Sequence, residues 1–318
     1  MVSSENPELS IVILSFNVKD LLLNCLDSVF QSKGELDRWQ VIVVDNASSD
    51  GSVEAVKRKY EIASSQTPRN DEVVELVENK ENLGFAAGNN KAIPFVSAPV
   101  ILFLNPDTVV VNHAIQKSLE VLLSNPDIGA LTCRVELPDG RLDYSCHRGF
   151  PTPWNSFAYF SGLAKMFPCS PFFSGYSASY LDIGKMHEVD CISGTFLMVR
   201  KIAGDQIGFW DKDYFFNGED IEFCYSLKMK GWKIYFYPEV KIIHFKGSSS
   251  GLWQTAGVKV EKGVKLTSAT HAASAMRIFY KKHYYQKYPP LFRDFVLWGV
   301  KLLEHYRKFR IITGLRYE

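Results

Sequence analysis

Two short motifs carry carboxylates that could bind a divalent cation or act as a general base. Asp107 ends the motif Asn105-Pro106-Asp107, directly after the apolar run V-I-L-F-L. A hard divalent cation prefers such an oxygen ligand and fills its remaining positions with diphosphate and water. Glu219 and Asp220 lie between aromatic residues, which would desolvate the pair and raise its basicity toward that of a general base. The alternatives are an Asx turn for the first motif and helix capping for the second.

A third acidic motif is V-V-D-N-A-S-S-D-G-S, at residues 43–52. Asp45 follows an apolar run of strand length, where it could accept hydrogen bonds from a ribose or from the N–H of a base. Asp50 is better explained as the cap of the helix that follows. Stabilisation of the turn explains Asp45 equally well, so its role stays open at this point.

Two weaker motifs complete the set. In E-N-L-G-F-A-A-G-N-N, Gly84 and Gly88 would let the backbone approach a phosphate where a helix begins, although helix–sheet packing explains both glycines equally well. The spacing is not G-x-G-x-x-G, so a dinucleotide fold gains no support. His244 ends the run I-I-H. A lone strand-end histidine is more often structural, but beside a metal–diphosphate site His244 and Lys246 become candidates for binding metal or phosphate.

The elements that must position these motifs alternate between strands and helices in the first third of the chain. Apolar runs separated by helical patterns predict a Rossmann-like, mostly parallel sheet with helices on both faces. Ligands bind beyond the carboxyl ends of such strands, and both Asp45 and Asp107 follow strand ends. Strands are expected at residues 10–15, 41–44, 73–77 and 100–104, and helices at 21–30, 86–96 and 113–124.

The middle of the chain, residues 141–184, is rich in Pro, Ser, Phe and Tyr and has little periodicity. A long aromatic loop is typical of a lid or substrate-binding segment, and an irregular packed insertion is the alternative. Regular patterns return with an expected strand at 191–200 and a helix at 221–230. Pro238 is expected to separate strands at 233–237 and 240–245.

From about residue 271 the chain becomes basic and aromatic. One helical stripe carries five apolar residues, with Lys and Arg largely off it: Phe295, Trp298, Leu302, Tyr306 and Phe309. A helix of this kind can lie in a membrane interface or pack on the body of the protein. The sequence leaves these two alternatives open.

The composition is that of an ordinary globular protein, with 318 residues, 46% apolar and 22% charged. A net charge of +1 argues against a general nucleic-acid binder. No basic–apolar secretion signal and no apolar run of membrane-spanning length is recognisable, so a cytoplasmic protein is expected. The six cysteines form no C-x-x-C pair, which favours free thiols over disulfides.

Taken in order, the motifs resemble those of bacterial family-2 glycosyltransferases of the GT-A fold, most closely the branch that includes rhamnosyltransferases. The matching stretches are S-I-V-I-L-S-F-N, V-I-V-V-D-N-A-S-S-D-G-S, N-L-G-F-A-A-G-N-N, L-N-P-D-T, I-S-G-T-F-L-M-V-R, G-E-D-I-E-F and I-I-H-F-K-G-S, from about residue 10 to 250. The resemblance implies an inverting transfer of a sugar from a nucleotide-diphosphate sugar, such as dTDP-rhamnose or a UDP-sugar. The acceptor would be a hydroxyl of a glycan or lipid-linked saccharide in cell-surface polysaccharide synthesis.

The resemblance also assigns roles to residues. Asp220 would be the catalytic base, with Glu219 its competitor, and Asp107 with His244 would bind Mg²⁺ or Mn²⁺. Gly194 and Trp232 would lie on the acceptor side. The nucleotide-sugar-binding residues would be Ser15, Asn17, Asp45, Asn46, Asn82, Gly84, Asn89, Asn105 and Asp107.

Two departures from the family pattern qualify these roles. The first acid of the family's D-x-D motif is Asn105 here, which would weaken metal binding. The family's E-D-x-D-x-x-x-R has Glu222 and Ser226 in place of its last Asp and Arg, and Lys228 or Lys246 could replace the missing cation.

The expected organisation is a catalytic GT-A domain at residues 1–250, followed by a helical, basic and aromatic extension at 251–318. Residues 1–135 would form the nucleotide-binding half and 136–250 the acceptor half. The expected partners are the donor, a glycan or lipid-linked acceptor and, under one alternative for the tail, the inner face of a membrane. A sugar-nucleotide pyrophosphorylase and a non-catalytic carbohydrate-binding protein are the rival functions.

Overall fold

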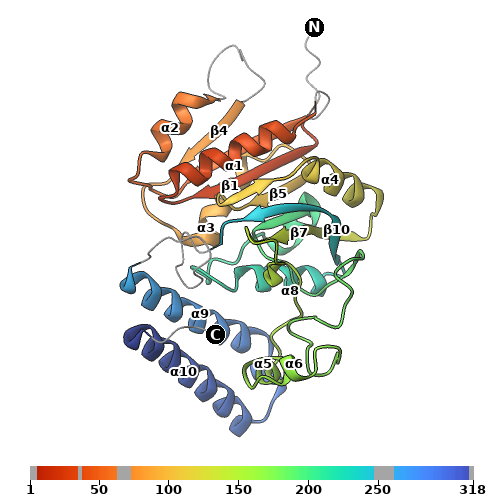
Figure 1. Ribbon diagram of the computed structural model, residues 1–318, viewed down its shortest axis with the longest axis vertical. Coiled ribbons are helices and arrows are strands. Elements are labelled where there is room, and N and C mark those ends of the chain that lie inside the picture. The colour runs from red at the N-terminus through yellow and green to blue at the C-terminus, as the bar shows by residue number, and fades with distance from the viewer. Residues whose placement is uncertain (1–5, 35–37, 63–72, 247–260, 315–318) are drawn as a thin grey trace.

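The computed structural model describes residues 6–34, 38–62, 73–246 and 261–314. Its centre is a ten-stranded sheet with the order β3-β4-β2-β1-β5-β9-β7-β10-β6, and β8 pairs with β10 (Figure 1). The strands are β1 (Leu9–Ser15), β2 (Trp39–Asp45), β3 (Glu61–Ile62), β4 (Val73–Glu78), β5 (Val100–Leu104), β6 (Thr108–Val110), β7 (Ile128–Glu136), β8 (His187–Glu188), β9 (Phe196–Arg200) and β10 (Lys233–His244).

The first half of the sheet is parallel throughout, from β3 to β5. Strand β9 then runs antiparallel to both β5 and β7, and β10 runs parallel to β7. The carboxyl ends of β1, β2, β5, β7 and β10 therefore lie along one edge, together with the beginning of β9. The predicted α/β fold with a mostly parallel sheet is confirmed.

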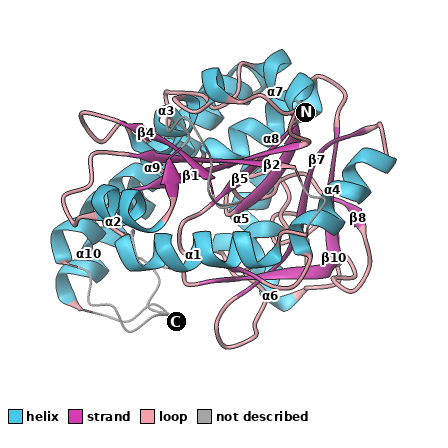
Figure 2. Cartoon of the chain, turned by 90° about the horizontal axis from the view of Figure 1, so that it is seen from above, coloured by secondary structure: helices cyan, strands magenta, loops and turns pink. Residues whose placement is uncertain are grey.

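Helices cover both faces of the sheet (Figure 2). Helix α1 lies on one face, and α7 and α8 lie on the other. The helices of this part are α1 (Lys19–Ser32), α2 (Ser52–Lys59), α3 (Gly84–Asn90), α4 (Ala114–Ser124), α7 (Lys201–Ile207) and α8 (Glu219–Met229), with 3₁₀ turns at Ile93–Phe95 and Tyr144–Cys146.

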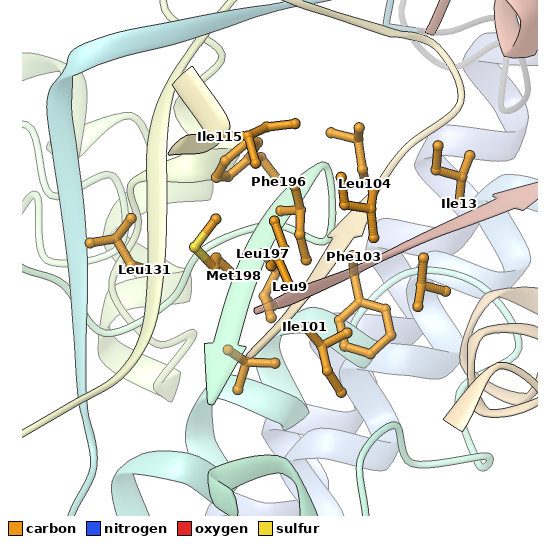
Figure 3. Packing of buried hydrophobic residues seen from close by; sticks show 14 of the residues in the cluster. Leu9, Ile13, Ile101, Phe103, Leu104, Ile115, Leu131, Phe196, Leu197 and Met198 are labelled. Atoms are coloured by element: carbon orange, nitrogen blue, oxygen red, sulfur yellow. The ribbon is translucent and has the colours of Figure 1, made fainter. Parts of the chain in front are cut away.

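The main core lies between these layers. Leu9, Ile101 and Phe196 come from three neighbouring strands and are fully buried (Figure 3). Phe103 contacts Trp210 edge-on, and Trp210 packs against Phe223 of α8. Burial of a large apolar side chain contributes about 1.5–3 kcal/mol. This packing fastens α8, and with it the acids at its start, to the sheet.

Several elements differ from the predictions. Strand β7 was not predicted, and β9 begins at Phe196 rather than at residue 191. Strand β10 is one strand, in which the register to β7 shifts between Tyr237 and Lys241. Pro238 lies in this shift, because it has no N–H to donate to the ladder. Helix α3 ends at Asn90, and a 3₁₀ turn follows where a longer helix was expected.

The aromatic middle segment holds two short helices, α5 (Pro153–Phe160) and α6 (Leu163–Met166). Beyond the sheet lie α9 (Lys262–His283) and α10 (Pro290–Thr313), which pack against each other, with a 3₁₀ turn at Tyr285–Lys287 between them (Figure 1). The predicted C-terminal helices are thus present. The expected domain boundary at residue 250 lies outside the described residues.

A polar contact joins the helical extension to the sheet domain. The Glu222 carboxylate on α8 lies 2.8 Å from His283 Nε2 of α9 and accepts a 2.8 Å hydrogen bond from Tyr214. All six cysteines are free, as predicted. Within the described part of the chain, no helix combines the length and apolar character needed to cross a membrane.

Candidate functional site

The carboxyl edge of the sheet collects most of the predicted site residues. Ser15 and Asp45 are register partners at the ends of β1 and β2. Asp107 follows β5, and His244 ends β10. The start of α8 reaches the same edge, because the backbone N–H of Phe85 in α3 donates to the carbonyl of Phe215 at 2.8 Å. Motifs far apart in the sequence therefore meet at one edge, as the strand ends predicted.

Asp45 is buried and only half satisfied. Its Oδ2 accepts a 2.9 Å hydrogen bond from the Ser48 backbone N–H, which is the turn contact that the sequence suggested. Its Oδ1 and the hydroxyl of neighbouring Ser15 are buried without a hydrogen-bond partner among the described residues. Buried polar atoms are nearly always paired, so these two atoms mark a place for a polar ligand.

The predicted asparagines build the loops around this place. Asn46 Nδ2 donates to Asn82 Oδ1 at 2.8 Å, and Asn46 Oδ1 accepts from the Leu83 N–H at 3.1 Å. Asn17 has a positive φ of 54° and joins the first two loops through Ser48 and Ser49. Asn89 Nδ2 donates to a carbonyl of its own helix, that of Phe85. These side chains shape the loops through bonds within the protein.

Gly84 has a structural reason of its own. Its φ is +78°, and a Cβ there would lie 2.4 Å from the carbonyl oxygen of Phe215. Any other residue would push apart the loop before α3 and the loop before α8. Gly88 packs in the same way against Leu14 of β1. Packing, the alternative considered above, therefore accounts for both glycines.

Asp107 belongs to a chain of alternating charges. His244 Nε2 lies 3.3 Å from Asp107 Oδ1, and His244 Nδ1 lies 2.9 Å from Asp143 Oδ2. Lys246 donates to the other oxygen of Asp143 at 2.7 Å. Burial acts to lower the pKa of His244, but the two carboxylates outweigh it and raise the pKa to about 9. Burial would raise the pKa of Asp143, yet His244 and Lys246 hold it well below its usual range.

The Asn105-Pro106-Asp107 motif is also a genuine turn. The Thr108 hydroxyl donates to the carbonyl of Asn105 at 2.7 Å, and the Asn105 N–H donates to the carbonyl of Thr195 at 3.1 Å. The turn leaves the Asp107 carboxylate buried and directed at His244. The motif can therefore form a turn and still place the Asp107 carboxylate where it could act as an oxygen ligand.

The Glu219–Asp220 pair lies at the start of α8, and Arg148 is the cation that contacts it among the described residues. The Arg148 guanidinium donates to Asp220 Oδ2 at 2.6 Å, and both side chains are largely buried. Glu219 Oε2 is buried and has no partner in the described part of the chain. Burial, and next the charge of Asp220, raise the pKa of Glu219 to about 8. Glu219 therefore carries a proton at neutral pH, whereas the ion pair fixes the orientation of the Asp220 carboxylate.

A tight turn presents this pair. Asn217 and Gly218 both have positive φ, 68° and 86°. A Cβ on Gly218 would lie 2.8 Å from the Cβ of Ala275 in α9, so the turn is held between α8 and the helical extension. Such backbone strain is found where the surrounding structure fixes a functional side chain.

Three further predicted residues lie apart from these contacts. Gly194 packs against Phe85, which a Cβ would approach to 2.8 Å. Trp232 precedes β10 and donates to Gln206 at 2.9 Å, so it lies at the opposite edge of the sheet from His244, and its surroundings give no support to an acceptor role. Lys228 is bound to Glu188 and Asp190 instead of replacing the family's missing arginine.

Sequence reasoning missed Asp143 and Arg148. Both lie in or next to the irregular segment after β7, and their partners are 101 and 72 residues away in the chain. No local motif surrounds either residue, so only the fold reveals them.

Comparison with known proteins gives this geometry its context. Residues 10–184 match the family model described as glycosyl transferase family 2. The N-acetylglucosaminyl-diphospho-decaprenol L-rhamnosyltransferase of Mycobacterium tuberculosis is 28% identical over 223 residues, which cover 66% of this chain and 68% of that protein. The poly-beta-1,6-N-acetyl-D-glucosamine synthase of Staphylococcus aureus is 25% identical over 72% of this chain, which spans about half (48%) of that protein.

Among solved structures, the mannosyltransferase PcManGT from Pyrobaculum calidifontis, in complex with GDP-Man and Mn²⁺, has a TM-score of 0.58 and 17% identity, covering 98% of this chain and 75% of that one. A likeness at this identity shows the GT-A fold. The family match covers more than half of the chain, and the expected resemblance is confirmed. The protein is a glycosyltransferase, and it belongs to glycosyl transferase family 2.

Proposed function

We propose that this glycosyltransferase moves a sugar, with inversion, from a nucleotide-diphosphate sugar to a hydroxyl of a glycan or lipid-linked saccharide in cell-surface polysaccharide synthesis. dTDP-rhamnose and UDP-sugars are the candidate donors. The similarity to a rhamnosyltransferase and to a polysaccharide synthase supports this choice. Family membership sets aside the rival pyrophosphorylase and the non-catalytic binding protein.

One observation carries the proposal. Ser15, Asp45, Ser193 and Glu219 each keep a buried polar atom without a partner in the described part of the chain. Ser15 and Asp45 end β1 and β2, Glu219 begins α8, and Ser193 lies in the loop that leads into β9. Each unsatisfied buried group costs about 1–3 kcal/mol. A ligand with hydroxyl and N–H groups on both sides of the edge would satisfy them, as a sugar nucleotide does.

Asp220 is the base in this proposal. Glu219 holds a proton at neutral pH and cannot accept another, which leaves Asp220 as the acid able to take the proton of the acceptor hydroxyl. Arg148 occupies Oδ2 of Asp220, so the proton would go to Oδ1, which accepts only a backbone contact from Ile221 in the described structure. Arg148 is a positioning residue, since it acts through Asp220.

The residues at Asp107 fit a divalent cation, Mg²⁺ or Mn²⁺. A carboxylate oxygen and an imidazole nitrogen lie 3.3 Å apart, and a cation bound there would displace the proton of His244 Nε2. The other nitrogen of His244 is held by a carboxylate, as is usual for a metal-binding histidine. No cluster of three or more candidate ligands occurs in the described residues, and a cation with two protein ligands would complete its shell with diphosphate oxygens. When bound, the cation would neutralise the charge of the leaving diphosphate.

The donor side and the acceptor side would divide as the sequence predicted. Residues 1–135 would bind the nucleotide through Asp45 and the loops built by Asn17, Asn46 and Asn82. Residues 136–250 would bind the acceptor near Asp220. The enzyme would work on the cytoplasmic side, where sugar nucleotides are present.

A screen of nucleotide sugars tests the proposal. The purified protein is given dTDP-, UDP- and GDP-sugars with Mg²⁺ or Mn²⁺, and release of the nucleotide diphosphate is measured. We expect release from one donor class, dependent on the metal and accelerated by a glycan acceptor. Absence of release from every donor, with donor binding intact, would contradict the proposal.

The matched control is Asp213→Asn. Asp213 is an exposed acid that precedes the same helix and pairs with Lys282, outside the proposed site. Its replacement should leave the rate of release unchanged. An inverting reaction should also give a product of opposite anomeric configuration to that of the donor, which NMR of the product reads directly.

A further inference from the structure

The helical extension and the aromatic middle segment expose apolar side chains that the catalytic reaction does not use. Along α10 the exposed residues recur every three or four positions, and each has more than half of its surface exposed: Leu291, Phe295, Trp298, Leu302, Tyr306, Phe309 and Ile312. The opposite side of α10 faces α9, where Val296 and Leu297 pack against the cluster that includes Phe279 and Tyr280, and Val300 is buried. The structure therefore turns the apolar stripe of the sequence outward.

The second exposed group lies in the segment from Gly149 to Tyr176. This excursion leaves and re-enters the fold at one point, because the Gly149 N–H donates to the Tyr176 carbonyl at 3.0 Å. Its exposed apolar side chains include Phe157 at 56%, Met166 at 68% and Phe172 at 62%. We call the residues between these ends the aromatic excursion.

These two groups meet. The guanidinium of Arg307 on α10 lies over the ring of Phe160 in the aromatic excursion, 5.7 Å from its centroid. Figure 1 shows α5, α6, α9 and α10 together at one end of the molecule, beyond α8. Exposed apolar side chains of two separate segments therefore lie next to each other, and large exposed apolar patches mark interaction sites.

The charges next to this surface are mostly positive. The aromatic excursion contains Lys165, which is exposed, and no acidic residue. Lys281, Lys287 and Lys301 are also exposed on the helical extension. Of the two acids of α10, Glu304 is bound by Arg277 and Lys308. Exposed lysines around an aromatic-rich face are typical of helices that lie in the headgroup region of an anionic bilayer.

We infer that the outer face of α10 and the aromatic excursion form one surface that binds an anionic phospholipid bilayer without crossing it. Helix α10 has 24 residues, about 36 Å of helix lying along the headgroups. This inference rests on the proposed function for its purpose, because a lipid-linked acceptor is held in such a bilayer.

The surface lies close in the chain to the cation that contacts Asp220, the proposed base, and this position suggests what the surface does. Arg148, which contacts Asp220, immediately precedes the closed ends of the aromatic excursion. Tyr176, at the other end, hydrogen-bonds the Arg148 side chain. The bilayer-facing residues and the base are therefore joined by a few residues of chain, which would bring the head of a lipid-linked acceptor to Asp220.

Flotation with lipid vesicles tests the inference on the full chain, without substrate. We expect the protein to float with vesicles of phosphatidylglycerol and phosphatidylcholine, and binding to pure phosphatidylcholine to be at least about tenfold weaker because the lysines lose their partners. Raising the salt concentration should reduce the difference between the two vesicles.

Two variants locate the surface. Trp298→Ser on α10 and Phe172→Ser in the aromatic excursion should each weaken vesicle binding by roughly tenfold, from the apolar area lost. Leu123→Ser, on α4, is the matched control, since Leu123 is 48% exposed and lies on a different helix. All three variants replace exposed side chains, so their thermal midpoints should match that of the unchanged protein.

Several results would overturn the inference. One is the absence of flotation with anionic vesicles, and another is an equal loss of vesicle binding in Leu123→Ser and Trp298→Ser. A third is self-association of the protein without vesicles that Trp298→Ser abolishes, because that result would assign the surface to a second copy of the chain. Release of nucleotide diphosphate with a water-soluble acceptor is measured separately. Flotation without such release contradicts the proposed function alone, and release without flotation contradicts the bilayer surface alone.

Discussion

The two acidic centres at the carboxyl edge balance their charges in opposite ways. Around Asp107 the charges alternate through His244, Asp143 and Lys246, so each acid has a cation beside it. At the start of α8, among the described residues, one cation, Arg148, pairs with Asp220 and none pairs with Glu219. At the second centre, by contrast, one acid, Glu219, keeps its proton at neutral pH. The carboxyl edge of the sheet can therefore offer a set of charged ligands at one centre and a single proton acceptor at the other.

The largest expected effect concerns the acid that carries the reaction. Asp220→Asn should lower kcat by roughly 10²–10⁴-fold, the usual contribution of a general base, and leave nucleotide binding nearly intact. Glu219→Gln should cost far less, because an amide resembles the protonated carboxyl that Glu219 already presents. Steady-state kinetics and nucleotide titrations check both variants. Equal losses of kcat would show that the two acids share the role.

The shared cation should matter next, and chiefly for stability. Arg148→Met leaves the largely buried Asp220 carboxylate without its ion-pair partner, and breaking a buried pair costs about 3–5 kcal/mol. Urea unfolding measures this loss. Adding Asp220→Asn to Arg148→Met should recover much of it, because the uncompensated charge is gone. Failure of the double variant to recover stability would place the role of Arg148 elsewhere, for example with Tyr176.

The alternating centre should respond through metal affinity. Asp143→Asn removes the carboxylate that orients His244, and such changes weaken metal binding by about 10–100-fold. Asp139→Asn is the control, since Asp139 lies nearby in the chain but pairs with the exposed Arg141. Titration with Mn²⁺ in the presence of a nucleotide diphosphate measures both. Unchanged affinity in Asp143→Asn would separate this centre from metal binding.

The smallest expected effect is a pH dependence of stability at Glu219. Its pKa is about 8 in the folded protein against an ordinary 4.5, so the unfolded chain loses a proton that the folded protein keeps. Stability from this group is present below about pH 4.5 and is lost as the pH rises to about 8. Glu219→Gln should therefore gain a few degrees of Tm relative to the unchanged protein across this window.

Glu222→Gln is the counterpart on the same helix. Burial acts to raise the pKa of Glu222, but the bond to His283 outweighs it and lowers the pKa, so its stabilising effect is present at neutral pH and lost in acid. The amide should lower Tm at pH 7 and have less effect in acid. Calorimetry of both variants over pH 5–8 would show opposite signs, and equal signs would contradict the contrast between the two glutamates.

Local pattern was sufficient for the elements that carry the family motifs. Strands β1, β2, β4 and β5 and the acids at their ends follow from apolar runs and the carboxyl-edge rule. Asp143 and Arg148 could not be predicted, because each gains its meaning from a partner brought to it by the sheet. The protonation of Glu219 is of the same kind, since it depends on burial that no neighbour in the sequence determines. Pro238 predicts a break between two strands, but β10 continues through it as one strand with a shift in its register to β7.

The closed ends of the aromatic excursion have an evolutionary consequence. Because the chain returns to its starting point at Gly149 and Tyr176, residues between them can be lengthened, shortened or exchanged without moving Arg148. The excursion is in this sense a cassette, and a graft from a relative could transplant a preference for a different acceptor. Selection could then diversify the glycan products of such enzymes while the machinery that breaks the donor bond stays constant.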